Sequence, residues 1–189
     1  MNQRNRNHRC MLIFVEGPKW SDTIGKYSWR NKLRMIWDKP AVAWQLAGGG
    51  LQAFLIGSRF RHVVITDGAV VCDYQYKSVK FWAYEEFIIR YPNILGWTLL
   101  DTDKKVDFSP YEGITHSLFM TTVSKLLMCA SRGIIQMTNC VTLVRGVAEC
   151  AGVKLPRKAW NPKLLLQHLT ENGCDFTSGK PPSLCGGAD

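Results

Sequence analysis

The sequence predicts an α+β fold in which an antiparallel sheet packs against a helix that begins at a cysteine. An alternating run, Arg61–Thr66, is joined by Asp67-Gly68 to a second run, Ala69–Gln75, and this pattern predicts a β-hairpin. Further along the chain, Cys140–Ala151 repeats apolar residues at helical spacing. With 189 residues, 46% of them hydrophobic, the chain is long enough for one well-packed domain and short for two.

Charge and composition divide the chain into three expected parts. Residues 1–40 form a basic, Trp-rich N-terminal arm that includes a first helix. Residues 41–172 form the folded domain that carries the hairpin and the cysteine helix. Residues 173–189 are rich in glycine and proline, and we expect them to form a flexible tail.

The arm carries most of the excess positive charge. Residues 1–40 hold nine Lys or Arg against three Asp or Glu, so +6 of the net charge of +9 lies there. Basic residues interleaved with tryptophans can bind nucleic acid through phosphate contacts and base stacking. The same composition suits an acidic protein or cell-wall partner, or a solvated arm that packs its tryptophans on the domain. The sequence leaves these alternatives open.

Local patterns predict the elements before the hairpin. Residues 1–10 are expected to be disordered, and Met11–Val15 is either a short strand or an anchoring segment. Ser28–Gln45 has helical spacing and is expected to break near Pro40, because the residue before a proline avoids the α region. The two segments that follow are a breaker, Gly48-Gly49-Gly50, and a short helix or strand, Leu51–Ile56.

The elements after the hairpin alternate between strands and helices. The expected strands are Val79–Trp82 and Trp97–Leu100, and the expected helices are Ser117–Ser131, Cys140–Ala151 and a last one from Pro162 to Gly173. Asn161 is a good N-cap, and Pro162 suits the first position of that last helix because its missing N–H would have no helical partner there.

The hairpin places a histidine and a carboxylate on the same side of the sheet. Asp67-Gly68 suits the two central positions of a type I′ turn, since both need a positive φ. In that register the facing pairs are Thr66 with Ala69, Val64 with Val71, and His62 with Asp73. Facing Cβ atoms lie within roughly 5.5 Å. A slip of one residue would bring Cys72 or Tyr74 opposite His62 instead.

Cys140 is the candidate nucleophile because it lies at the start of a helix. The positive end of the helix dipole and the N–H groups of the first turn favour thiolate over thiol, and Thr138 and Asn139 both suit the N-cap. A free cysteine often only fills a core, which is the simpler alternative. Cys129 and Cys150 lie within helical runs and are expected to be packing residues.

His62 is the candidate base that would activate the thiol. Asp73 is the expected partner that orients the imidazole, and Gln75, on the same face, is the other polar candidate. A satisfied structural histidine at a strand start is the alternative interpretation of His62. His116 could supply the base in its place.

Two segments resemble a known family. Gly57–Ile65 resembles the histidine strand of the circularly permuted papain-like cysteine hydrolases, which include the NlpC-type peptidases and the lecithin–retinol acyltransferase group. Thr138–Arg145 and the following segment to Leu165 resemble the cysteine helix of small phage-encoded members. In the permuted branch histidine precedes cysteine, as here. Where the family pattern has a serine, this chain has Arg61, whose guanidinium is expected to lower the pKa of His62.

The resemblance implies acyl transfer on an amide (peptide) or ester bond. Cys140 would be the nucleophile, His62 the base and Asp73 the third residue. The oxyanion would be held by the backbone N–H of Cys140, with the side chain of Asn139 or Gln136. No metal or organic cofactor is implied. The alternative is an inactive family member, a phage accessory or virion protein that binds a phage or host protein, or nucleic acid through residues 1–40.

The sequence also predicts the compartment. Seven cysteines are an odd number without CxxC spacing, which indicates free thiols in a reducing compartment. The polar start lacks a secretory signal, so we expect the protein in the host cytoplasm, if phage-encoded, or in the virion. The uncharged stretch from Pro40 to Ser58 centres on a triple glycine and is expected to be core rather than a membrane span.

Overall fold

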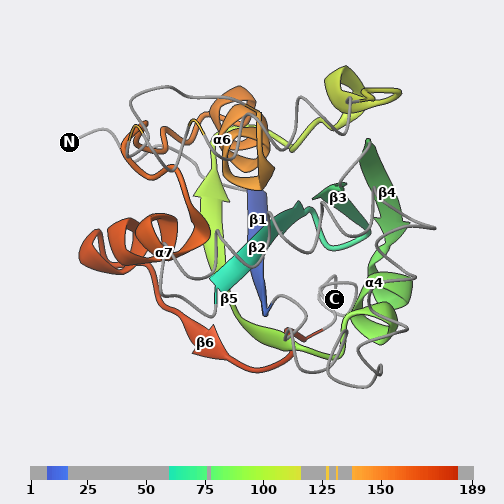
Figure 1. Ribbon diagram of the computed structural model, residues 1–189, viewed down its shortest axis with the longest axis horizontal. Coiled ribbons are helices and arrows are strands. Elements are labelled where there is room, and N and C mark those ends of the chain that lie inside the picture. Colours follow the sequence, from blue (N-terminus) through green and yellow to red (C-terminus); the bar gives the residue numbers. More distant parts are fainter. Residues whose placement is uncertain are drawn as a thin grey trace, which may run out of the picture.

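The computed structural model describes residues 8–16, 60–75, 78–115, 127, 131 and 138–182. Over these ranges the protein is an α+β domain, as predicted, built on a six-stranded antiparallel sheet with helices on both faces (Figure 1). The elements in chain order are β1 His8–Glu16, β2 Phe60–Thr66, β3 Val70–Tyr74, β4 Val79–Ala83, α4 Tyr84–Arg90, β5 Ile94–Thr102, η1 Ser109–Tyr111, α6 Cys140–Cys150, α7 Pro162–Glu171 and β6 Thr177–Ser178.

β1 lies inside the sheet, in the strand order β4-β3-β2-β1-β5-β6. Its residues from Cys10 to Phe14 are fully buried, because β2 and β5 flank the strand and both of its faces are covered. The predicted arm therefore fails for residues 8–16, which are core, and residues 8–10 are strand rather than disordered. The other residues of the arm lie outside the described ranges.

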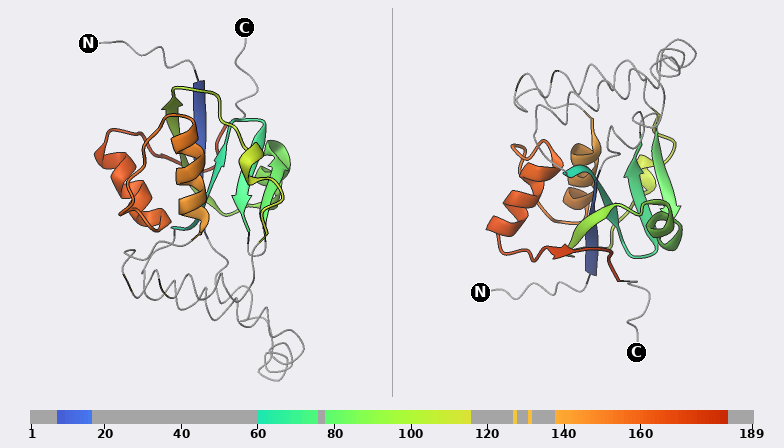
Figure 2. Two further views of the ribbon diagram at one scale, coloured as in Figure 1. Left: turned by 90° about the horizontal axis from the view of Figure 1, so that it is seen from above. Right: turned by 60° about the horizontal axis from the view of Figure 1, so that its bottom comes forward.

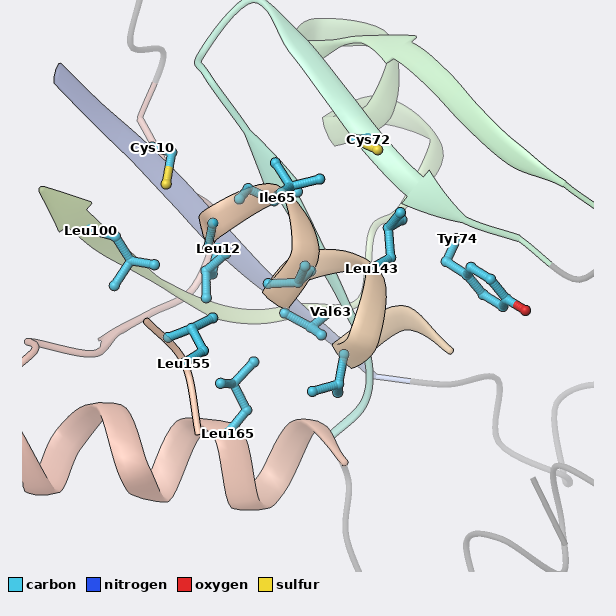
Figure 3. Packing of buried hydrophobic residues seen from close by; sticks show 14 of the residues in the cluster. Cys10, Leu12, Val63, Ile65, Cys72, Tyr74, Leu100, Leu143, Leu155 and Leu165 are labelled. Carbon is cyan, nitrogen blue, oxygen red and sulfur yellow. The ribbon is translucent and has the colours of Figure 1, made fainter. Parts of the chain in front are cut away.

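Each face of the sheet has its own core. On one face, β1, β2 and β3 contribute Leu12, Val63, Ile65 and Cys72 to a cluster shared with α6 and α7 (Figure 3). On the other face, a smaller cluster joins side chains of β1, β2 and β3 to α4. Figure 2 shows α6 and α7 together on one side, with α4 beside β3 and β4 at the edge of the sheet. We call the face covered by α6 and α7 the cysteine face, and the face covered by α4 the acid face.

The β2–β3 hairpin forms as predicted, but the predicted register is wrong by two residues. Thr66 pairs with Val71, and Ile65 pairs with Cys72, so the loop is wider than the two-residue turn. Asp67 explains the difference, since its Oδ1 accepts hydrogen bonds from the backbone N–H of Ala69 (3.0 Å) and Val70 (2.9 Å). A shift of two residues keeps every side chain on its predicted face, so His62 and Asp73 still share one.

The C-terminal segment packs on the sheet, contrary to the predicted flexible tail. β6 pairs with β5, and Phe176 meets the Phe14 ring edge-on at 6.0 Å between centroids. The Tyr84 hydroxyl donates a hydrogen bond to the carbonyl of Pro182 at 2.7 Å. The prediction is therefore wrong for residues 173–182, while residues 183–189 lie outside the described part of the chain.

Of the other predicted helices and strands, some are confirmed and some lie outside the described residues. Strands β4 and β5 and helices α6 and α7 are confirmed, with Asn161 capping α7 and Pro162 at its start. α4 and β6 were not predicted. Several predictions fall outside the described residues: helix Ser28–Gln45, segment Leu51–Ile56, nearly all of helix Ser117–Ser131, and the side chains of His116, Cys129 and Gln136. Among the described helices, none is long and apolar enough to cross a membrane.

Candidate active site

Cys140 is the first residue of α6, where the sequence places it. Asn139 caps the helix: its Oδ1 accepts from the Thr142 N–H at 2.8 Å, and the Thr142 hydroxyl accepts from the Asn139 N–H at 2.7 Å. This reciprocal capping box fixes the backbone on which Cys140 sits. The thiol side chain is half-buried at the edge of the cysteine-face core.

Hydrogen bonds from segments distant in the sequence also hold the start of α6. The Tyr74 hydroxyl, from the end of β3, donates to the carbonyl of Thr138 at 3.1 Å. The Asn139 amide donates to the carbonyl of Trp160 at 3.0 Å. One turn into the helix, buried Arg145 donates to the carbonyl of Ala159 at 3.1 Å. The cysteine helix is thereby tied to the sheet on one side and to the 157–160 segment on the other.

His62 lies near the beginning of β2, opposite Val15, next to an irregularity in the β1–β2 ladder. Its Nε2 is 2.6 Å from Oδ1 of Asp73, and its side chain is 23% exposed while that of Asp73 is 0% exposed. The His62 side chain is also hydrogen-bonded to the side chain of Cys140. The imidazole therefore bridges the thiol of one face and the carboxylate of the other.

The surroundings of His62 favour its charged form. Burial has the largest single effect and lowers the pKa, but hydrogen bonds and negative charge from Asp73 and Cys140 outweigh it and raise the pKa of His62 from 6.5 to about 10. The imidazole is accordingly an imidazolium at neutral pH. The side chain of Arg61 lies outside the described residues, so its expected lowering of the His62 pKa stays a prediction.

Asp73 is a buried carboxylate with a full set of donors. Oδ1 faces His62, while Oδ2 accepts from Gln75 Nε2 at 2.9 Å, Trp82 Nε1 at 3.2 Å and the Tyr91 hydroxyl at 3.2 Å. Burial alone would raise the pKa of Asp73, but His62, Gln75 and Trp82 lower it below its usual value. Asp73 therefore stays ionised although it is enclosed by protein.

The two candidates for the third residue have different places. Asp73 contacts His62 directly, whereas Gln75 donates to the far oxygen of Asp73 and to the Tyr91 hydroxyl at 3.0 Å. Gln75 thus lies behind the carboxylate. Asn139, an expected oxyanion donor, already uses its oxygen for Thr142 and one amide hydrogen for Trp160.

Trp82, Tyr91 and Tyr74 belong to the site but were not predicted from the sequence. No local motif marks them, because each is placed by strand pairing or by the unpredicted helix α4. The expectation that Cys150 is a packing residue is also wrong: its side chain is exposed at the end of α6. It is, however, a useful reference thiol, in the same helix as Cys140 but remote from its start.

Comparisons of the chain with known protein families, with curated proteins and with solved structures find no match. The site is therefore interpreted from its own geometry. In the described part of the chain, no group of three or more His, Cys, Asp or Glu side chains is placed to hold a metal ion.

Proposed function

We propose that this protein is a thiol-dependent hydrolase or acyltransferase that cleaves an amide (peptide) or ester bond. One observation carries the proposal: His62 is hydrogen-bonded both to the side chain of Cys140, at a helix start, and to the buried carboxylate of Asp73. A nucleophile, a base and a group that orients the base are the parts that acyl transfer requires. The order histidine, acid, cysteine along the chain supports a circularly permuted papain-like fold.

The first half of the reaction would form an acyl-enzyme. The Cys140 thiolate attacks the carbonyl carbon, a C–S bond forms, and an electron pair moves onto the oxygen. When the carbonyl reforms, the bond to the leaving amine or alcohol breaks, and His62 gives that group its proton. Because Nε2 is engaged with Asp73, Nδ1 would be the nitrogen that exchanges the proton with the thiol and the leaving group.

The second half would release the acyl group. Water, for a hydrolase, or another nucleophile, for an acyltransferase, gives a proton to His62 and attacks the thioester. The C–S bond breaks, and the electron pair returns to sulfur as the Cys140 thiolate. Asp73 stabilises the imidazolium in both halves without taking the proton, since its own pKa is held low.

The oxyanion would be held by the backbone N–H of Cys140 at the first position of α6. Such a donor is fixed before substrate arrives, which is what makes an oxyanion hole effective. The capping bonds of Asn139 support this role indirectly, because they fix the peptide unit that carries the Cys140 N–H.

The test is selective alkylation. At about pH 6 an ordinary thiol is protonated and reacts slowly with iodoacetamide, while a thiolate paired with an imidazolium reacts fast. We expect Cys140 to be modified at least ten times faster than Cys150, the exposed thiol of the same helix, with both followed by peptide mass spectrometry. A panel of peptide, isopeptide and ester substrates then identifies the scissile bond. Equal rates at the two cysteines would sink the enzymatic proposal and favour the inactive, partner-binding alternative.

A further inference from the structure

Besides Gln75, two donors hold Oδ2 of Asp73, and they come from the side of the sheet opposite the cysteine helix. Trp82 belongs to β4, and Tyr91 is the residue at which α4 ends. Both reach the same oxygen, Oδ2, so they approach Asp73 from behind as seen from His62. None of the proposed chemical steps uses these two side chains.

Both donors are themselves held in place. The guanidinium of Arg90 lies 4.5 Å from the centre of the Trp82 ring, and the ammonium of Lys80 lies 5.5 Å from it, so the indole makes two cation–π contacts. The Tyr91 ring stacks on buried Phe87 at 4.4 Å between centroids. Arg90 and Tyr91 are consecutive at the end of α4, and the helix therefore supports both donors.

We propose that Trp82 and Tyr91 are positioning residues that fix Asp73 so that its Oδ1 points at His62. The inference rests on the proposed function, since it concerns the same site. A buried carboxylate seeks donors for both oxygens, and one that lacks a donor on Oδ2 would rotate or admit water to find one. With Oδ2 bound by Trp82 and Tyr91 in addition to Gln75, the short bond from Oδ1 to His62 is the arrangement that satisfies the whole carboxylate.

The charged and titratable groups around His62 and Asp73 determine how the proposal can be tested. They are Cys140 from α6, Arg90 from α4 with Tyr91 just after it, Lys80 from β4, and Cys72 beside Asp73 in β3. Burial, reinforced by the charge of Asp73, raises the pKa of both Tyr91 and Cys72 to about 12. A titration step near pH 10 is therefore assigned to His62.

The experiment measures that step in two ways. The rate of Cys140 alkylation by iodoacetamide is followed across the alkaline range, and the His62 imidazole is titrated by NMR. Trp82→Phe keeps an aromatic ring and removes the N–H, and Tyr91→Phe removes one hydroxyl. The matched controls are Trp97→Phe, whose Nε1 has no hydrogen-bond partner among the described residues, and Tyr84→Phe, whose hydroxyl bonds Pro182. Both control side chains belong to the same acid-face core.

We expect Trp82→Phe and Tyr91→Phe each to lower the His62 step by about half a pH unit to one unit, and the double variant to lower it further. The two controls should leave it in place. If the step stays unchanged or rises in both variants, the donors do not position Asp73 and the inference is wrong. Should Trp82→Phe fail to fold, Tyr91→Phe decides. The NMR titration keeps this outcome separate from failure of the proposed function, because it does not depend on a reactive thiol.

Discussion

The two faces of the sheet hold their site residues by different means. On the cysteine face, Cys140 is fixed by a capping box made between residues three apart in sequence. On the acid face, Oδ2 of Asp73 is held by Gln75, two residues further along the chain, and by Trp82 and Tyr91, nine and eighteen residues away. The nucleophile is thus positioned by a local cap supported by bonds to Tyr74 and Trp160, whereas the acid takes two of its three Oδ2 donors from outside its own strand.

This difference determines which substitutions would displace Cys140 and which would displace Asp73. A helix start with its cap persists as long as the helix does, so Cys140 should keep its place when distant side chains change. Asp73 depends on β4 and α4 keeping their arrangement on the smaller of the two cores. We therefore expect substitutions on the acid face to alter the pH dependence of the site, and substitutions at the cap to alter stability.

The largest effect is expected for Cys140→Ala. Removing the sulfur removes the group that forms the acyl-enzyme, so turnover should fall by on the order of a thousandfold or more. The fold should persist, because the side chain is only half-buried at the edge of the core. Turnover of the substrate found in the panel measures the loss, and Cys150→Ala is the matched control. Activity that survived in Cys140→Ala would assign the chemistry to another residue.

Asp73→Asn should have the next largest effect. Asp73 raises the pKa of His62, so an amide in its place should move the pKa down from about 10 toward the ordinary 6.5. The alkaline limit of turnover should move in the same direction, because turnover needs the imidazolium to protonate the leaving group. The amide nitrogen would also face a donor, and each buried group left unpaired costs about 1–3 kcal/mol. A NMR titration of His62 that stays near pH 10 in this variant would contradict the assignment.

The ion pair between His62 and Asp73 makes the stability of the fold depend on pH. The pKa of His62 is higher in the folded protein than its ordinary value, so the stabilisation is fully present below about pH 6.5 and is lost as pH rises toward 10. The unfolding temperature of the wild type should therefore fall more across this pH window than that of Asp73→Asn. Parallel curves for the two proteins would show that the ion pair adds nothing to stability.

The sequence predicted local features well and tertiary ones poorly. The hairpin, the start of α6 at Cys140 and the start of α7 after Asn161 follow from turn and capping residues that act over a few positions. The register was wrong because Asp67 binds the loop backbone, which the Asp-Gly pair alone does not indicate. His62 and Asp73 still met, since an even shift preserves the face.

The acid-face donors could not be predicted for the same reason. Trp82 reaches Asp73 because β4 pairs with β3, and Tyr91 reaches it because α4 turns the chain back over the sheet. Neither event has a short sequence signature. Met11–Val15 was expected to be a short strand or an anchoring segment, and the strand is confirmed. Its start at His8 and its place inside the sheet were missed, because the polar residues before the apolar run suggested an arm.

A smaller effect is expected at the cap of the cysteine helix. Asn139→Ala removes the Oδ1 acceptor of the Thr142 N–H and the amide bond to Trp160. Loss of such a cap costs about 1 kcal/mol, so denaturant unfolding should shift by that amount. Asn161→Ala, which removes the equivalent cap of α7, is the matched control. Equal losses of stability, with slower Cys140 alkylation in Asn139→Ala alone, would support local positioning of the nucleophile.

The smallest effect on the fold is expected for deletion of residues 1–7, which ends just before β1 begins at His8. Residues 1–10 were expected to be disordered, which would allow their removal, but Cys10 is fully buried and pairs with Leu100 in the sheet. We expect the shorter deletion to leave thermal unfolding unchanged and the longer one to lower it. The shorter deletion removes Arg4 and Arg6, so binding to an anionic partner, tested with single-stranded DNA, should weaken and lose part of its salt dependence. If the shortened chain binds as tightly as the full one, residues 1–7 take no part in recognising such a partner.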